Sequence, residues 1–303
     1  MISIIICTYN REKYLELCLN ALGKQNITSN LYEVLIIDNN SSDNTKLIGK
    51  TFSSSKHNFF YFLEHHQGLS FARNRGIKEA KGNTLIFLDD DVIAPHNYLN
   101  NILLFQKENP QIKVFGGKTT PFFEEEQPKW LSTYLMPLYA QINLGEGVKK
   151  MKNHQFPVGA NMIFRRSVFN ENVFFNINLG RKGDSLEAGE EKQLFNELRQ
   201  RKIYPYYSSQ CEVKHLIPAT RLNLQYVKKQ ALGIGKSERI RSRACKEYSK
   251  SVFLELLKWI ATAFLSFLFI VKLQPSKGIT LIKFRVWVST TLLFKTKNNN
   301  TLF

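Results

Sequence analysis

The segment LIFLDDDVI, residues 85–93, places three consecutive carboxylates directly after four apolar residues. The four apolar residues are typical of a strand inside a parallel sheet that helices cover on both faces. Asp89, Asp90 and Asp91 repel one another and raise each other's pKa unless a cation or hydroxyl donors neutralise them. Carboxylate oxygens of this kind suit Mg²⁺ or Mn²⁺. The segment therefore predicts a buried strand that ends in a cation site, and the alternative is a solvated acidic turn.

Alternating strand and helix patterns surround this segment. The β-branched, apolar run 2–7 predicts a first strand, and apolar residues at helical spacing predict the helix after it: Tyr14, Leu15, Cys18, Leu19 and Leu22. Further strands are expected at 32–37 and 59–63. A helix is expected from about residue 45, a loop at 68–74 leads into a helix at 75–80, and a further helix beyond residue 97 ends at about residue 108. This order predicts an α/β fold with a doubly wound, mostly parallel sheet and helices on both faces.

Polar residues follow the expected strands where each of them ends. The first strand leads into Thr8, Tyr9, Asn10 and Arg11, and the second leads into Asp38. In a doubly wound sheet, ligands bind outside the carboxyl ends of the strands, so these residues and 89–91 are expected to converge. Since no glycine-rich phosphate fingerprint follows the first strand, the pattern argues against a dehydrogenase or an NTPase.

The second half offers two further candidate regions. A strand is expected at 112–115, an acidic loop at 121–129, and a strand at 157–164 whose Gly159 indicates a close approach to the backbone. Glu190 and Glu191 open a helix that runs to about residue 201, where the helix dipole alone would also favour acids. His215 closes the last of two short strands expected at 203–207 and 213–215.

The carboxyl-terminal part carries most of the basic charge. The chain has a formal net charge of +17, and from residue 221 onward 16 Lys and Arg stand against 3 Glu. Basic helices are expected at 221–232 and 237–247, followed by apolar stretches at 259–271 and 279–294. The first stretch is shorter than the roughly 20 residues that cross a bilayer, so we expect the pair to lie in the membrane interface. Two alternatives stay open for these stretches: they form a re-entrant or membrane-spanning hairpin, or they pack onto the globular body.

Four segments in the first hundred residues resemble glycosyltransferase family 2 enzymes with the GT-A fold. They are IIICTYNR at 4–11, VLIIDNNSSDNT at 34–45, GLSFARNRGI at 68–77 and LIFLDDDVIAP at 85–95. The later segments PVGANMIFRRSVF at 157–169 and LEAGEEKQLFNELRQRKIYPYY at 186–207 resemble the acceptor-side strand and the catalytic-acid helix of that family. The order and spacing of the segments make the resemblance specific, and it extends to about residue 215.

The resemblance implies roles for individual donor-side residues. Thr8, Tyr9 and Asp38 would line the nucleoside pocket, and the neighbouring Asn10 and Arg11 would also bind the donor. Either Arg73 or Arg75 would lie near the diphosphate, and Arg73 is favoured. Asp89 and Asp91 match the two acids of the DxD motif, with Asp91 as the expected metal contact, and Asp90 faces the ribose or the donor sugar.

On the acceptor side, the resemblance makes Glu191 the catalytic base and Glu190 its neighbour, although family members often carry Glu-Asp at this point. His215 would contact the metal or the diphosphate, and a purely structural histidine is the alternative. The chain is expected to have a first half, residues 1–110, that binds the nucleotide sugar and a second half, residues 111–220, that binds the acceptor and carries out catalysis. Residues 221–303 are expected to form a basic, membrane-associated helical tail.

The implied activity is metal-dependent, inverting transfer of a sugar from a nucleotide-diphosphate donor to an acceptor hydroxyl, with Mn²⁺ or Mg²⁺ as the cofactor. The expected partners are a UDP, GDP or dTDP sugar, a glycan or lipid-linked glycan of the cell envelope, and an anionic membrane surface, but no nucleic acid. Four cysteines without paired spacing fit a reducing compartment, so a cytoplasmic location on the inner face of the membrane is expected. A sugar-phosphate nucleotidyltransferase and a non-catalytic membrane-surface binding protein are the alternatives.

Overall fold

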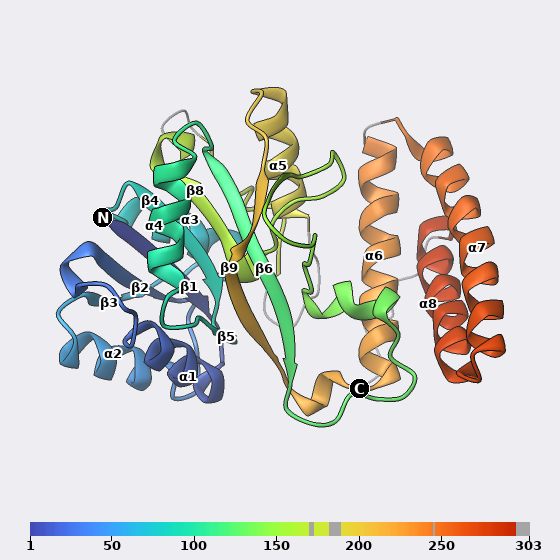
Figure 1. Cartoon of the computed structure of the whole chain (residues 1–303), viewed down its shortest axis with the longest axis horizontal. Coiled ribbons are helices and arrows are strands. Elements are labelled where there is room, and N and C mark those ends of the chain that lie inside the picture. The colour runs from blue at the N-terminus through green and yellow to red at the C-terminus, as the bar shows by residue number, and fades with distance from the viewer. Residues whose placement is uncertain (170–172, 182–188, 245, 295–303) are drawn as a thin grey trace. The chain divides into compact units, whose positions relative to one another are not determined.

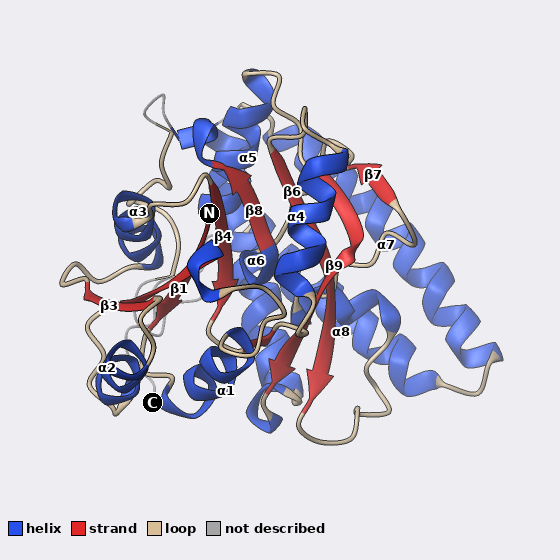
Figure 2. Cartoon of the chain, turned by 60° about the vertical axis from the view of Figure 1, so that its left-hand side comes forward, coloured by secondary structure: helices blue, strands red, loops and turns tan. Residues whose placement is uncertain are grey.

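The computed structural model describes residues 1–169, 173–181, 189–244 and 246–294. The chain forms two compact units. The first contains most of residues 1–217 apart from 123–138, and the second contains 123–138 and most of the chain from Pro218 onward. Figure 1 labels the α-helices of both units and the strands other than β7, which Figure 2 labels.

One sheet organises the first unit. Its strand order is β3-β2-β1-β4-β8-β6-β9-β5, and β7 pairs with β9. The strands are β1 (Ile2–Thr8), β2 (Tyr32–Asp38), β3 (Phe59–Leu63), β4 (Thr84–Asp89), β5 (Val92–Ile93), β6 (Val114–Phe123), β7 (Val148–Lys150), β8 (Met162–Arg165) and β9 (Tyr206–Ile217). The pairs among β3, β2, β1 and β4 are parallel, whereas β8 joins β4 antiparallel. The predicted α/β class is confirmed, and the sheet is mixed.

The α-helices of the first unit are α1 (Glu12–Leu22), α2 (Thr45–Ser55), α3 (Leu69–Glu79), α4 (Tyr98–Glu108) and α5 (Glu190–Gln200). Figure 2 shows them in blue around the red strands. Successive residues of β1 point to opposite faces, so Ile4 and Ile6 join one core with α1 and α4, while Ile5 joins a second core with α3 and α5. The helices therefore cover both faces of the sheet, as the apolar strand pattern predicts.

Several predicted boundaries differ from the structure. The segment 68–74 is not a loop, since α3 starts at Leu69 and buries Ala72 and Ile77 against the sheet. The two strands expected at 203–207 and 213–215 are one strand, β9, and the strand expected at 112–115 extends through the glycine pair to Phe123. Tertiary packing decides these cases, because neighbouring strands supply hydrogen-bond partners that no local pattern reveals.

Three long helices dominate the second unit: α6 (Leu224–Ala244), α7 (Tyr248–Val271) and α8 (Pro275–Leu293). The two basic helices expected at 221–232 and 237–247 are thus a single helix, α6. Gly235 lies within it, and a methyl group there would stand 2.1 Å from the carbonyl oxygen of Val288 on α8. A side chain at Gly235 would therefore force α6 and α8 apart.

Candidate active site

The carboxyl ends of three parallel strands bring the predicted donor-side residues to one edge of the sheet. Thr8 at the end of β1 stands beside Asp38 at the end of β2. Cys7, one residue earlier, stands beside Asp89 at the end of β4. The register of the sheet therefore brings together the three strand ends that the sequence marks with polar residues.

The loops after β1 and β2 are joined by hydrogen bonds. The backbone N–H of Asn10 donates to Ser41 Oγ at 3.0 Å, and that of Arg11 donates to Thr45 Oγ1 at 3.0 Å. In return, the backbone N–H of Ser42 donates to Asn10 Oδ1 at 2.8 Å. Asn10 has a φ of 52°, a backbone conformation that Asn tolerates better than most residues. These contacts hold the loop of residues 8–11 in place at the sheet edge.

Asp38 is fully buried, and its two carboxylate oxygens accept hydrogen bonds from within the protein. The backbone N–H of Ser41 donates to Oδ1 at 2.8 Å, and the Tyr61 hydroxyl donates to Oδ2 at 2.6 Å. Burial and this contact raise the pKa of Tyr61. In this arrangement Asp38 orders the loop after β2, and its contact with a nucleoside stays a prediction.

Asp89, Asp91 and His215 form a possible metal site, since each offers a ligand atom and these atoms lie within 4.8 Å of one another. The pairing of β5 with β9 places His215 there, because Val92 stands opposite it in the sheet. His215 Nε2 lies 2.9 Å from Asp91 Oδ1. Its Nδ1 lies 3.2 Å from the carbonyl oxygen of Tyr139. When Nδ1 carries the proton and donates to Tyr139, Nε2 keeps a lone pair, so the donor set fits a divalent cation.

Arg11 lies beside the same acids. Its Nη2 is 3.5 Å from Asp91 Oδ2, and its Nε is 3.8 Å from Asp90 Oδ1. Burial raises the pKa of Asp90 to about 7, an effect that the Arg11 charge opposes and the neighbouring Asp91 reinforces. The acidic cluster therefore needs positive charge, and Arg11 supplies part of it.

A buried arginine joins the two acids at the start of α5. Arg73 on α3 donates from Nη1 to Glu190 Oε1 at 3.0 Å and from Nη2 to Glu191 Oε1 at 2.8 Å. Its guanidinium also lies over the ring of Phe175, with 5.0 Å between Cζ and the ring centroid. Burial raises the pKa of Glu191 to about 7, and the charge of Arg73 opposes that rise. Arg73 is thus held by the acids, and its contact with a diphosphate stays a prediction.

Gly159 lies where the two groups of residues meet. A methyl group at this glycine would stand 2.4 Å from Arg73 Nη2, 2.6 Å from Glu191 Oε1 and 3.3 Å from Asp89 Oδ1. The sequence predicts a close approach to the backbone here, which the structure confirms, but the strand expected at 157–164 was wrong, since Gly159 lies in a 3-10 helix and β8 begins at Met162. Asp89, at the end of β4, and Glu191, at the start of α5, therefore border the same small region.

Some residues of the site were not identified from the sequence. Tyr61 reaches Asp38 from a neighbouring strand, and the carbonyl group of Tyr139 faces His215. Neither residue belongs to a motif, and only the sheet register and the path of the loop bring them near. Arg75, the alternative to Arg73, forms a half-buried ion pair with Glu79 on the same helix, α3, and does not join the site in this structure.

Comparison with known proteins identifies a family. The family model described as glycosyl transferase family 2 matches residues 3–173. A glucosyl-dolichyl phosphate glucuronosyltransferase of Haloferax volcanii is 22% identical over 249 residues, which cover 79% of this chain and 76% of that protein. A dolichyl N-acetyl-alpha-D-glucosaminyl phosphate 3-beta-D-2,3-diacetamido-2,3-dideoxy-beta-D-glucuronosyltransferase of Methanococcus voltae is 37% identical over 124 residues, 38% of each chain.

Among solved structures, the mannosyltransferase PcManGT of Pyrobaculum calidifontis in complex with GDP-Man and Mn²⁺ has a similar fold. The TM-score is 0.62 at 14% sequence identity, and the match covers 96% of this chain and 87% of that one. At this identity the similarity concerns the fold.

Proposed function

The chain belongs to glycosyl transferase family 2, and we propose that it transfers a sugar, with inversion, from a nucleoside-diphosphate donor to an acceptor hydroxyl. The observation that carries this proposal is the meeting of Asp89, Arg73 and Glu191 around Gly159. A donor-side acid and a candidate base thus border one small region. This is the arrangement that transfer from a leaving diphosphate to an incoming hydroxyl requires.

The donor binds at the strand ends in this proposal. Thr8, Tyr9, Asn10 and Asp38 line the nucleoside pocket. Arg11 and Asp90 contact the rest of the donor, namely its ribose, its sugar and its diphosphate. The donor is a UDP, GDP or dTDP sugar. This assignment is supported by the hydrogen bonds that join the loops after β1 and β2.

Asp89, Asp91 and His215 would hold Mn²⁺ or Mg²⁺. When bound, such an ion supplies positive charge against the negative charge of the departing diphosphate. The support for this assignment is the short distance among the three ligand atoms and the second hydrogen bond of His215 to a backbone carbonyl. Arg11 lies close enough to add its own charge to the same oxygens.

Glu191 accepts the proton of the acceptor hydroxyl as the new bond forms. Its pKa of about 7 suits a general base near neutral pH, since the group is then substantially deprotonated and still basic. Arg73 keeps Glu191 oriented and holds Glu190 beside it. A role of Glu190 as the base is the alternative, because Arg73 contacts both acids in the same way.

The acceptor is a glycan or a lipid-linked glycan, as the dolichyl phosphate names of two relatives suggest. In this proposal residues 1–110 bind the donor and residues 111–220 bind the acceptor and carry the base. The basic helices after residue 221 associate with an anionic membrane surface. The enzyme then works in cell-envelope synthesis on the cytoplasmic face of the membrane.

The activity is tested with a panel of UDP, GDP and dTDP sugars, with Mn²⁺ or with a chelator, and release of the nucleoside diphosphate is measured. We expect release with one donor class in the presence of metal. Asp91→Asn should abolish metal-dependent release and leave the circular dichroism spectrum unchanged. Full activity of Asp91→Asn would overturn the metal assignment. Pyrophosphate release from a nucleoside triphosphate and a sugar phosphate would instead indicate a nucleotidyltransferase.

A further inference from the structure

Helix α7 exposes large apolar side chains along most of its length. Six outward-facing residues between Leu256 and Val271 have exposed fractions from 58% to 69%: Leu256, Ile260, Phe264, Phe267, Ile270 and Val271. Only 17% of the most apolar 18-residue window of this helix is buried, whereas a core helix of a soluble protein is mostly buried. An apolar face of this extent indicates that something covers it.

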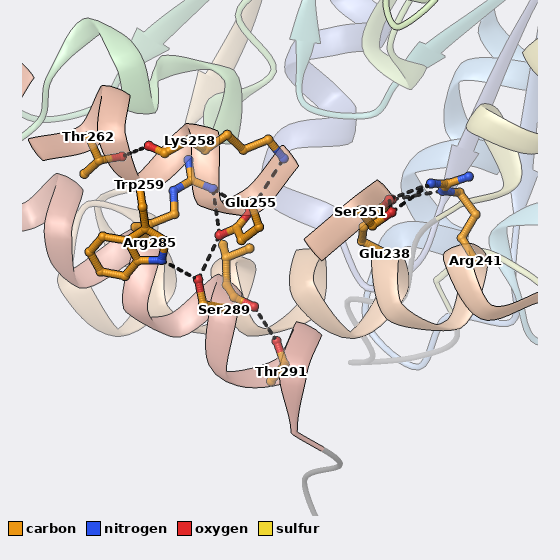
Figure 3. Close-up of polar contacts among 11 residues, drawn as sticks. Glu238, Arg241, Ser251, Glu255, Lys258, Trp259, Thr262, Arg285, Ser289 and Thr291 are labelled. Carbon is orange, nitrogen blue, oxygen red and sulfur yellow. Dashed lines mark hydrogen bonds and ion pairs between the residues drawn. The ribbon is translucent and has the colours of Figure 1, made fainter. Parts of the chain in front are cut away.

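The buried residues of α7 are polar, and three of the four have short side chains. They are Ser251, Glu255, Thr262 and Ser266. Glu255 accepts from Arg285 and Ser289 of α8, at 3.2 Å and 2.8 Å, and Trp259 Nε1 donates to Ser289 Oγ at 2.9 Å, as Figure 3 shows. Farther along the helix, Ser266 Oγ donates to the carbonyl oxygen of Gly278 at 3.2 Å. We call this set of contacts between α7 and α8 the polar seam.

The polar seam inverts the pattern of a water-soluble helix pair. In water, helices pack through apolar stripes and expose charged residues. In lipid, apolar side chains face outward, while small residues let the helices approach and polar side chains pair across the interface. Gly278 is such a small residue, since a methyl group there would stand 3.0 Å from the Ser266 carbonyl oxygen. The pair is therefore built for contact with hydrocarbon.

Length and charge limit how the pair sits in lipid. The whole of α7, with 24 residues, is long and apolar enough to cross a membrane by length and composition. Its uncharged part, Trp259–Val271, has only 13 residues, and at about 1.5 Å per residue this part spans about 20 Å. The hydrocarbon layer of a bilayer is about 30 Å thick. Exposed lysines stand on both sides of this part, Lys250 before it and Lys272 after it, while Lys258 pairs with Glu255 at 3.6 Å. A helix that lies along one leaflet keeps Lys250 and Lys272 at its anionic headgroups.

We propose that α7 lies within the acyl chains of a single leaflet of an anionic bilayer, with α8 joined to it through the polar seam. This inference rests on the membrane association in the proposed function and names the partner as lipid hydrocarbon. The contact is apolar insertion, and the lysines add attraction to anionic headgroups at its edges.

The depth of α7 is tested with Phe264→Trp in the full chain, added to vesicles of phosphatidylcholine and phosphatidylglycerol. We expect lipids brominated on the acyl chain to quench the fluorescence that this tryptophan adds to that of the three native tryptophans more than a headgroup quencher does, and high salt to leave the protein bound. Leu47→Trp is the matched control, because Leu47 on α2 is 64% exposed and outside the helix pair. Equal quenching of both variants, or release by salt, would overturn the proposal.

A second measurement concerns the single leaflet. Ser276→Cys, in the exposed first turn of α8, should react with a membrane-impermeant maleimide from outside the vesicle, above the labelling of the native protein. Protection from the reagent would mean that the turn crosses the bilayer. A different result would be that, without lipid, the tryptophan of Phe264→Trp is protected from an aqueous quencher while the protein has twice the mass of one chain. That result would mean that a second copy of the chain covers the apolar face, and it would overturn the proposal.

Failure of this inference is distinguishable from failure of the proposed function. Sugar transfer to a detergent-soluble acceptor in micelles tests the chemistry without a bilayer. A protein that transfers sugar in micelles but does not insert overturns only the insertion. A protein that inserts but releases no nucleoside diphosphate from any donor overturns only the glycosyltransferase proposal.

Discussion

Arg73 Nη2 lies 2.8 Å from Glu191 Oε1, although the two residues are 118 positions apart in the sequence. The same guanidinium reaches Glu190, so one arginine on α3 fixes both acids at the start of α5. A planar guanidinium with several N–H donors suits this task better than an ammonium group does. The position of the candidate base is therefore set by a residue of α3, a helix far from α5 in the sequence.

The pH dependence of transfer should follow the raised pKa of Glu191. A base must be deprotonated, so kcat/KM should rise with pH, reach half its maximum near pH 7 and level off above it. Arg73→Gln removes a positive charge that stabilises the Glu191 carboxylate, so the pKa of Glu191 should rise. The rise of kcat/KM should then occur at higher pH. Arg75→Gln removes the same charge from a half-buried pair on the same helix, outside the site, and should leave the profile unchanged. An unchanged profile in Arg73→Gln would contradict the role of Arg73.

Glu190 and Glu191 should differ in their effects on turnover. Glu191→Gln keeps the shape of the side chain but removes the base, so kcat should fall about 100-fold or more. Glu190→Gln should have a smaller effect, because Glu190 is more deeply buried and, in this proposal, only supports the orientation of Arg73. Steady-state kinetics of both variants decide the assignment. A larger loss in Glu190→Gln would make Glu190 the base.

Arg11→Gln should strengthen metal binding in the absence of nucleotide. Arg11 lies 3.5 Å from Asp91, so its charge competes with a cation for the same carboxylates. We expect the affinity for Mn²⁺ to rise roughly tenfold, as the electron paramagnetic resonance signal of free Mn²⁺ would report. Lys13→Gln is the control, because it removes the same charge two positions away, from a side chain that lies over the Tyr14 ring. Weaker Mn²⁺ binding by Arg11→Gln would show that Arg11 does not compete.

Gly159→Ala should reduce activity much more than stability. The added methyl group would meet the ends of the Arg73 and Glu191 side chains, which can move aside but then leave their working positions. We expect kcat to fall about tenfold or more, with little change in Tm. Gly117→Ala is the contrasting variant, because its methyl group would stand 1.5 Å from the backbone oxygen of Cys211 and should lower Tm strongly. Equal losses of Tm in the two variants would contradict this distinction.

Much of the donor side was predictable from local pattern. The apolar runs ending at Thr8, Asp38 and Asp89 are central strands, and the five apolar residues of the first helix are all buried. A parallel sheet brings the carboxyl ends of its strands to one edge, so the convergence of these residues follows from the strand pattern. The resemblance to the family then pointed to Glu191 as the opposing group.

The tail was less predictable, because the orientation of a helix depends on its neighbours. The composition of 259–271 indicated membrane affinity, but it did not show that Glu255 faces Arg285 and that the apolar residues face outward. The loop expected at 68–74 was wrong for a similar reason. Contacts of Ala72 and Ile77 with the sheet outweigh the weak helix preference of the residues around them.

By itself, the sequence determined the central parallel strands, the order of their polar ends and the family. Only the tertiary structure decided that Arg73 contacts Glu190 and Glu191, that Arg11 lies beside Asp91, and that His215 joins the acids. These contacts link residues that are 80 to 124 positions apart in the sequence. They therefore depend on strand register and helix packing. Local pattern sets which face of a strand is buried, whereas the assembled sheet sets which side chains meet at its edge.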